Sequence, residues 1–380
     1  METQFSKVYV YCPRGLETGG PEALHQLVAS LCSQGIDAFI VPTPGTEGNR
    51  PVDRYREYSC PEAEIAEDVS GAAVVAPEPW IDLLLAFRRA TPVCWWLSVD
   101  NAKYAPRRSH RDRDVVATPR GRAMWLARNV SSPYRSLRRR LFPYDRMLHL
   151  AQSAYAWCYL KWTLGVEAGS LSDFTVVPAL DAHLEAADRR FLAYNPAKGG
   201  PAVERLKASG WDFGGLEPLA LREMSHSEVV ASLKQSLVYL DLGHHPGKDR
   251  MPREAVSMGC VVLVARRGAA SYLADVPLAP EYKLDVTDLD ASVRRAVAAV
   301  TADSGLARER QSSYRLTVSL ERSIFDSQVR SFFIEGRFTD ESVAATFALS
   351  LDDYDRWVAP RPRAGEPLGS GFADITATTK

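Results

Sequence analysis

The chain has 380 residues, of which 24% are charged and 46% are hydrophobic. At roughly 150 residues per domain, this length is sufficient for two or three globular units. The 46 Lys and Arg residues nearly balance the 47 Asp and Glu residues, so the formal net charge is −1. That balance excludes a polycation that coats nucleic acid or anionic lipid over its whole surface.

The sequence shows no pattern typical of export or of a transmembrane helix. No stretch of about 18 uncharged apolar residues occurs, and residues 1–12 lack the basic and apolar regions of a secretory signal. The six cysteines are widely spaced, as expected for buried thiols in a reducing compartment. The seven histidines show no zinc-ligand spacing. We therefore expect a cytoplasmic protein that holds neither a metal nor a cofactor.

The first 100 residues alternate between strand and helix patterns. We expect a helix at residues 21–31, with Pro21 in its first position, and an amphipathic segment at residues 80–89. β-Branched and aromatic runs predict four strands, at residues 8–12, 36–41, 72–76 and 93–99. Such alternation is typical of βαβ crossovers, and therefore of a parallel sheet that is covered on both faces.

Residues 103–146 differ sharply in charge from the rest of the chain. They contain thirteen Lys or Arg residues and three Asp residues, a net charge of +10, which leaves −11 for the remainder. Prolines divide this basic insertion into short pieces, so we expect a partly helical excursion and not a domain. Three interpretations stay open: attraction of an anionic acceptor such as a lipid-linked phosphate, peripheral contact with an anionic membrane, or a solvated face.

Strand and helix patterns continue after the insertion. Helical spacing predicts a helix at residues 148–164, with Gly165 as its C-cap. Ser225 and Glu228 have the spacing of a capping box. Further strands are predicted at residues 191–194, 237–242 and 260–265, and further helices at residues 225–236, 252–259, 289–300 and 306–333. The Pro-, Gly- and Thr-containing residues 360–380 favour a disordered tail.

Two loops at the ends of predicted strands offer features that bind anions. Gly19 and Gly20 precede a helix, so a ligand could approach the backbone and its free N–H groups; an ordinary tight turn is the alternative. The cations and the helix start of the second loop, residues 243–254, suit a diphosphate. Its Glu254 could accept two ribose hydroxyls or simply be a surface acid near a helix start.

The second loop and the strand after it resemble the donor-site signature of group 1 (family 4) glycosyltransferases, which have the glycosyltransferase-B fold. The likeness lies in Arg253, Glu254 and the Met-Gly-Cys-Val-Val run from residue 258. The Gly19-Gly20 pair looks like the N-terminal diglycine loop of that fold. Residues 194–199 are similar to the turn that opens its C-terminal domain, with Lys198 matching a phosphate-binding lysine.

The resemblance implies an α/β protein of two Rossmann-like domains that face each other across a cleft. The implied domains are an acceptor domain at residues 1–178, which carries the basic insertion, and a nucleotide-sugar domain at residues 179–318. Helices at residues 319–358 would cross back to the first domain, before a flexible tail at residues 359–380. The implied activity is sugar transfer from a nucleotide-sugar donor to a glycan, lipid-linked or small-molecule acceptor, with retention at the anomeric carbon. We find no carboxylate cluster for a divalent ion, so cations and helix N-termini would neutralise the leaving phosphate without a metal.

The predicted site residues follow from these motifs and from their positions at strand ends. The predicted catalytic residues are Asp100 and His245, and the predicted acceptor-binding residues are Asn101, Gln152 and Ser153. The predicted donor-binding residues are Gly19, Gly20, Lys198, His244, Lys248, Arg250, Arg253 and Glu254.

Departures from the family pattern leave alternatives open. Pro246 stands where the family has a glutamate, eight residues before Glu254, and no arginine accompanies Lys198. The His245-Pro246 pair is similar to the pair that binds cytidine monophosphate in sialyl- and Kdo-transferases, so a CMP-sugar donor is one alternative. A noncatalytic nucleotide-sugar binder is the second. A nucleic-acid-binding protein that uses the basic insertion is the third, but the balanced net charge argues against it, and we expect no nucleic-acid partner.

Overall fold

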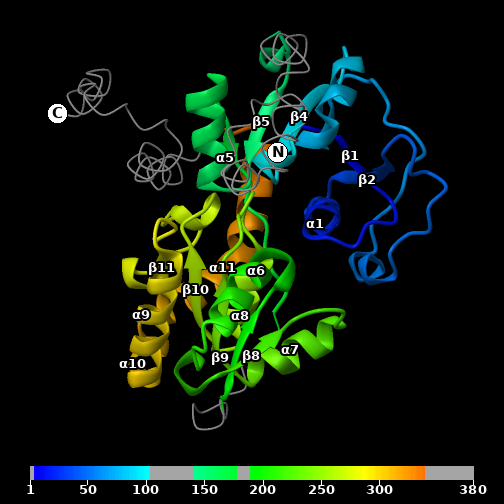
Figure 1. The fold of residues 1–380 in the computed structure, drawn as a ribbon. Coiled ribbons are helices and arrows are strands. Elements are labelled where there is room, and N and C mark those ends of the chain that lie inside the picture. The colour runs from blue at the N-terminus through cyan, green and yellow to red at the C-terminus, as the bar shows by residue number, and fades with distance from the viewer. Residues whose placement is uncertain (1–3, 103–140, 178–188, 339–380) are drawn as a thin grey trace, which may run out of the picture.

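The computed structural model describes residues 4–102, 141–177 and 189–338. These residues form two lobes, each built around one parallel sheet (Figure 1). Most of the basic insertion lies outside the described residues, as do residues 339–358 and the tail. The predicted class, two Rossmann-like α/β units, is confirmed by the two sheets.

The first lobe contains a six-stranded parallel sheet in the order β2-β1-β3-β4-β5-β6. Side chains alternate between its two faces because a strand has a period of two. Val8 and Val10 therefore enter the core under helix α1 (Gly19–Ser33), while Tyr9 enters the core on the opposite face. The strands are β1 (Lys7–Cys12), β2 (Asp37–Pro42), β3 (Ala72–Pro77), β4 (Thr91–Trp96), β5 (Leu148–Ala151) and β6 (Gly169–Ser170).

Three local predictions for the first lobe need correction. Helix α1 begins two residues before Pro21, which still lies in the first turn, where its missing N–H costs no hydrogen bond. The amphipathic segment forms 3-10 turns, Glu78–Ala86, instead of an α-helix. The helix predicted at residues 148–164 is replaced by β5, helix α5 (Ala154–Cys158) and a π-helical turn, Tyr159–Leu164, that ends at Gly165. The four residues of β5 are too few to show a reliable periodicity in the sequence. The segment is a strand because it pairs with β4.

The second lobe contains a five-stranded parallel sheet in the order β11-β10-β9-β7-β8. Its strands are β7 (Phe191–Tyr194), β8 (Glu217–Ala220), β9 (Ser236–Asp241), β10 (Val261–Ala265) and β11 (Lys283–Leu284). Its helices are α6 (Pro196–Ala208), α7 (His226–Lys234), α8 (Arg250–Ser257) and α9 (Leu289–Ala302). The predicted capping box of α7 is confirmed, since the Ser225 side chain and the Glu228 carboxylate bond each other's backbone N–H.

Helix α11 (Ser312–Val329) connects the two lobes (Figure 1). Its early residues Tyr314 and Val318 belong to the core of the second lobe, whereas Phe325 and Val329 belong to the core of the first. The helix predicted at residues 306–333 is divided, because α10 (Ser304–Glu309) ends before α11 begins and a π-helical turn, Arg330–Ile334, follows α11. None of the described helices is both long and apolar enough to cross a membrane.

Candidate active site

A cavity of about 870 Å³ lies between the two lobes. Its walls come from the loop before α1, from the ends of β3 and β4, and from the loop that leads into α8. This volume falls within the range of about 300 to 1,000 Å³ that is usual for small-molecule sites. Below, we call this cavity the cleft. Of the predicted site residues, those that line it are Gly19, Gly20, Asn101, Gln152, Lys198, Lys248 and Arg250.

Three helices begin at the cleft. Gly19 and Gly20 open α1, Asn195 caps α6, and Asp249 precedes the first residue of α8. The first turns of a helix present backbone N–H groups without intrahelical partners, together with the positive end of the helix dipole. Three such ends around one cavity make it attractive to an anion.

The diglycine loop approaches the opposite lobe closely. A Cβ atom on Gly19 would lie 3.2 Å from the side chain of Arg250 in the second lobe. Further along the cleft, the backbone N–H of Val99 donates to the Pro246 carbonyl over 3.0 Å. The lobes therefore meet at the edges of the cleft, which leaves space for a ligand between these contacts.

The cationic side chains in the cleft have carboxylate partners. Lys198 forms an ion pair with Asp249. Arg250 reaches across the cleft to Glu22 of α1. The Lys248 Nζ donates to Ser172 Oγ over 2.8 Å and lies 3.3 Å from Glu321 Oε1. These side chains are only partly buried, so an anionic ligand could displace their partners.

Two predicted acceptor residues, Gln152 and Asn101, line the cleft, and Gln152 also joins the two lobes. The Gln152 Oε1 accepts a hydrogen bond from the Lys248 backbone N–H over 3.1 Å. Asn101 donates from Nδ2 to Ser98 Oγ over 2.9 Å at the first-lobe wall. Ser153 does not line the cleft, because its hydroxyl caps α5 by accepting from the Ala156 N–H.

Asp100 of the first lobe and His244 of the second lobe are in contact, although neither lines the cleft. The His244 Nε2 contacts the Asp100 carboxylate, and both side chains are largely buried, with 11% and 8% exposure. The Tyr155 hydroxyl lies 3.5 Å from the same carboxylate. Asp100 is thus held in contact with an imidazole and next to Asn101, a lining residue of the cleft.

His245 is not placed in the cleft. Its side chain is fully buried, with Nε2 3.3 Å from Asp241 Oδ1 and Nδ1 3.5 Å from Asp249 Oδ2. Burial acts to raise the pKa of Asp241, but the charges of His245 and Lys198 outweigh it and lower that pKa. An imidazole ring enclosed in this way supports the loop. Both the predicted catalytic role and the CMP-binding alternative would require an exposed His245, and the ring is not exposed.

Asp241, His245 and Asp249 form a cluster that the sequence analysis missed. Their ligand-type atoms lie within 4.8 Å of one another, which corrects the expectation that no carboxylate cluster exists. The ammonium group of Lys198 contacts the Asp249 carboxylate in this cluster, so the chain itself supplies a cation there. The spacing of four residues from 241 to 245 to 249 was the available signal, although Asp241 ends β9 and the other two residues lie in the loop that follows, instead of on one helix face.

Arg253 also lies outside the cleft, contrary to the donor-binding prediction. Its guanidinium is 1% exposed and forms two hydrogen bonds with the Asp173 carboxylate, of 3.1 and 2.9 Å. It donates as well to Glu321 over 2.9 Å and to the Lys248 carbonyl over 2.7 Å. With these donors engaged, Arg253 joins α8 to α11 and to the connection between the lobes. No local pattern around Asp173 or Glu321 predicts this partnership.

Glu254 is likewise not a lining residue of the cleft. Its side chain is buried, and its Oε1 accepts from Arg250 Nη2 over 3.2 Å. The carboxylate thus holds Arg250 from one helical turn away, a spacing of four residues. In this conformation Glu254 positions a cleft cation and does not present its oxygens to a ligand.

Comparison with known proteins supports the architecture. No protein-family model matches the sequence, and no curated protein matches it significantly. Among solved structures, a sucrose-phosphate synthase from Thermosynechococcus elongatus superposes with a TM-score of 0.53 at 12% identity, over 92% of this chain and 98% of that one.

Two further solved structures resemble the chain less well. The catalytic domain of starch synthase IV from Arabidopsis thaliana gives a TM-score of 0.48 at 8% identity, covering 85% of this chain and 99% of that one. The T4 phage BGT in complex with UDP and Mn2+ gives 0.41 at 9% identity, covering 85% and 99%. Together with the two parallel sheets, the likeness to the sucrose-phosphate synthase confirms that the chain has the glycosyltransferase-B fold.

Proposed function

We propose that the chain is a glycosyltransferase that binds the diphosphate of a nucleotide sugar in the cleft and transfers the sugar to an acceptor held by the first lobe. The observation that carries the proposal is the convergence of three helix N-termini and three cationic side chains, Lys198, Lys248 and Arg250, on one cavity. Both kinds of group favour a phosphate anion, and both face the space between the lobes.

The chemistry requires stabilisation of the leaving group. As the glycosidic bond to phosphate breaks, the sugar gains oxocarbenium character and negative charge grows on the phosphate oxygens. Lys198 and Arg250 are placed to neutralise that charge once the ligand displaces Asp249 and Glu22. The protein's own cations thus supply the electrostatic stabilisation, and we propose a metal-independent transfer with retention at the anomeric carbon.

Asp100 is our candidate for the group that receives the acceptor's proton. It lies after β4, directly before the lining residue Asn101, and His244 of the second lobe contacts its carboxylate. A carboxylate paired with an imidazole can take a hydroxyl proton and pass it on. Exchange of Asp100 for Asn should therefore lower the rate of sugar transfer much more than the affinity for nucleotide.

Donor binding can be tested with Lys198→Gln. We expect the affinity for the preferred nucleotide, identified by calorimetry among UDP, GDP, ADP, dTDP and CMP, to fall by about ten- to hundredfold. This is the range for a lost hydrogen bond to a charged group. The matched control is Lys207→Gln in the same helix, because Lys207 contacts exposed Glu204 and does not line the cleft. Equal affinities of the two variants, or no binding of any of these nucleotides, would overturn the proposal.

A further inference from the structure

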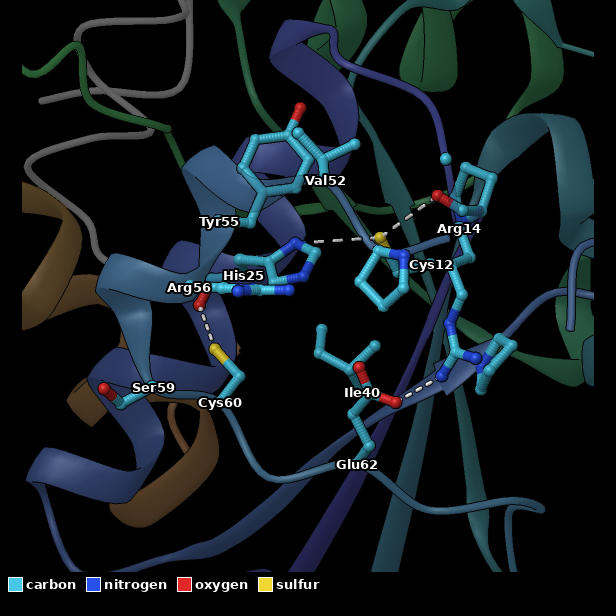
Figure 2. A pocket seen from close by; sticks show the side chains of 14 residues that line it. Cys12, Arg14, His25, Ile40, Val52, Tyr55, Arg56, Ser59, Cys60 and Glu62 are labelled. Atoms are coloured by element: carbon cyan, nitrogen blue, oxygen red, sulfur yellow. Dashed lines mark hydrogen bonds and ion pairs between the residues drawn. The ribbon is translucent and has the colours of Figure 1, made fainter. Parts of the chain in front are cut away.

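A second, smaller cavity lies in the first lobe beside the cleft (Figure 2). Its volume is about 220 Å³, and its walls come from the end of β1, from α1, from β2 and from a 3-10 helix, Asp53–Tyr58. We call this cavity the side pocket. A cavity of about 150 Å³ accommodates a benzene ring. The side pocket is therefore large enough for one six-membered ring with polar substituents, and too small for two.

The side pocket and the cleft share a wall. Pro13 lines both cavities. The side chain of Tyr55 lines the side pocket. Its hydroxyl accepts a hydrogen bond from the Thr18 N–H over 3.0 Å and can donate one to the Thr18 carbonyl over 2.9 Å. Thr18 is the N-cap residue of α1 and lines the cleft. A ligand in the side pocket would thus sit against the loop that carries Gly19 and Gly20.

His25 provides the polar group at the centre of the side pocket. Figure 2 shows its ring between Tyr55 and Cys60, facing Cys12 and Ile40 across the space. Its Nδ1 lies 2.8 Å from the Pro21 carbonyl oxygen, which can only accept a hydrogen bond, so Nδ1 carries the proton. Burial lowers the pKa of His25, which keeps the ring neutral. The other nitrogen, Nε2, therefore bears a lone pair, and the described residues give it no hydrogen-bond donor.

The remaining walls are apolar or internally neutralised. Ile40, Val52 and the Tyr55 ring supply apolar surface. Arg14 is paired with Glu62 at the rim (Figure 2), and the exposed Arg56 is paired with Asp53. An anion would gain little from guanidinium groups that already have carboxylate partners. A neutral ligand that combines apolar ring faces with hydroxyl donors fits these walls better.

We propose that the side pocket binds one neutral, hydroxyl-bearing ring of the acceptor, with His25 Nε2 accepting a hydroxyl hydrogen. The inference rests on the proposed transferase function, because only a transferase has an acceptor to place there. The ring lies on the first-lobe side of the diglycine loop, so it would hold the acceptor next to the donor without entering the cleft.

The test uses the full chain, with and without a saturating concentration of the nucleotide it prefers, and neutral methyl hexopyranosides as probes. Saturation-transfer NMR should show binding of at least one probe. Val52→Phe, which fills the side pocket, should abolish that signal. His25→Phe, which keeps a ring against Tyr55 but lacks the lone pair, should weaken binding by about fivefold, the effect of one hydrogen bond. His25→Gln, which offers an amide oxygen, should restore most of the affinity.

The matched control is His226→Gln, since His226 is exposed on α7 in the other lobe. Binding that survives Val52→Phe, or the absence of binding by every probe, would overturn the side-pocket proposal. Nucleotide affinity and thermal midpoint are measured on the same samples, which exposes a variant that does not fold. If the hexopyranosides bind in a Val52-dependent way while no nucleotide binds, the ring site is supported and the transferase function is refuted.

Discussion

The cationic side chains of the second lobe fall into two groups with different surroundings. Arg253 is enclosed with Asp173 and Glu321: its side chain is 1% exposed and does not line the cleft, although its partner Asp173 does. Lys198 and Arg250 are also paired with carboxylates, but their side chains are 28% and 20% exposed and line the cleft. An ion pair that is fully enclosed supports the structure, whereas one that borders a cavity can exchange its partner for a ligand.

The largest expected effect is on the enclosed group. Arg253→Met would leave Asp173 buried without its guanidinium partner and Glu321 paired with Lys248, so we expect a loss of about 3 to 5 kcal/mol in the free energy of unfolding. Urea denaturation measures it. The matched control is Arg310→Met, which breaks the exposed pair with Glu281 and should cost less than about 1 kcal/mol. Similar losses in both variants would show that enclosure does not distinguish the two kinds of pair.

A carboxyl group without a cation sharpens the comparison. Glu78 is buried in the cleft wall, where its carboxyl accepts from the Leu97 N–H over 2.9 Å. Burial raises the pKa of Glu78 from about 4.5 to about 8. Between these pH values the unfolded chain has lost a proton that the folded chain keeps, so stability should fall as pH rises, by up to about 1.4 kcal/mol per pH unit.

This dependence can be measured by denaturation at pH 5 to 8. Glu78→Gln is neutral at every pH, so its stability relative to the unaltered chain should increase steadily across that interval. Glu64→Gln, at an exposed position of the same lobe, should give a curve parallel to that of the unaltered chain. A parallel curve for Glu78→Gln as well would mean that the Glu78 carboxyl titrates normally.

The smallest expected effect concerns the exchangeable pair in the cleft. Asp249→Asn removes the carboxylate that competes with a phosphate for Lys198, while Asn still serves as an N-cap of α8. Calorimetry should show nucleotide affinity rising by about two- to fivefold, the range for a weak ion pair. Asp290→Asn, whose exposed carboxylate contacts Arg205, should leave affinity unchanged. Weaker nucleotide binding by Asp249→Asn would contradict this competition and would mean that Asp249 holds Lys198 in position for the ligand instead.

The sequence permitted most of the fold to be predicted, but only part of the site. Alternating strands and helices predicted two parallel sheets, and the short strand β5 was misread because its four residues show no distinct period. The diglycine loop, Lys198, Lys248 and Arg250 were found correctly as residues that line one cavity. Arg253 and His245 do not line the cleft as predicted, since the local sequence of a helix start or a loop gives no indication of what will enclose a side chain there.

By itself, the sequence determined which segments become strands and helices, because hydrophobic periodicity and helix caps act over a few neighbouring residues. It also determined that two loops would carry glycines and cations at strand ends. Only the tertiary structure decided which cations remain available to a ligand. Glu22, Asp173 and Glu321, the partners that orient or enclose them, lie from 68 to 228 residues away in the chain, and burial of a charge depends on such distant partners instead of on its neighbours.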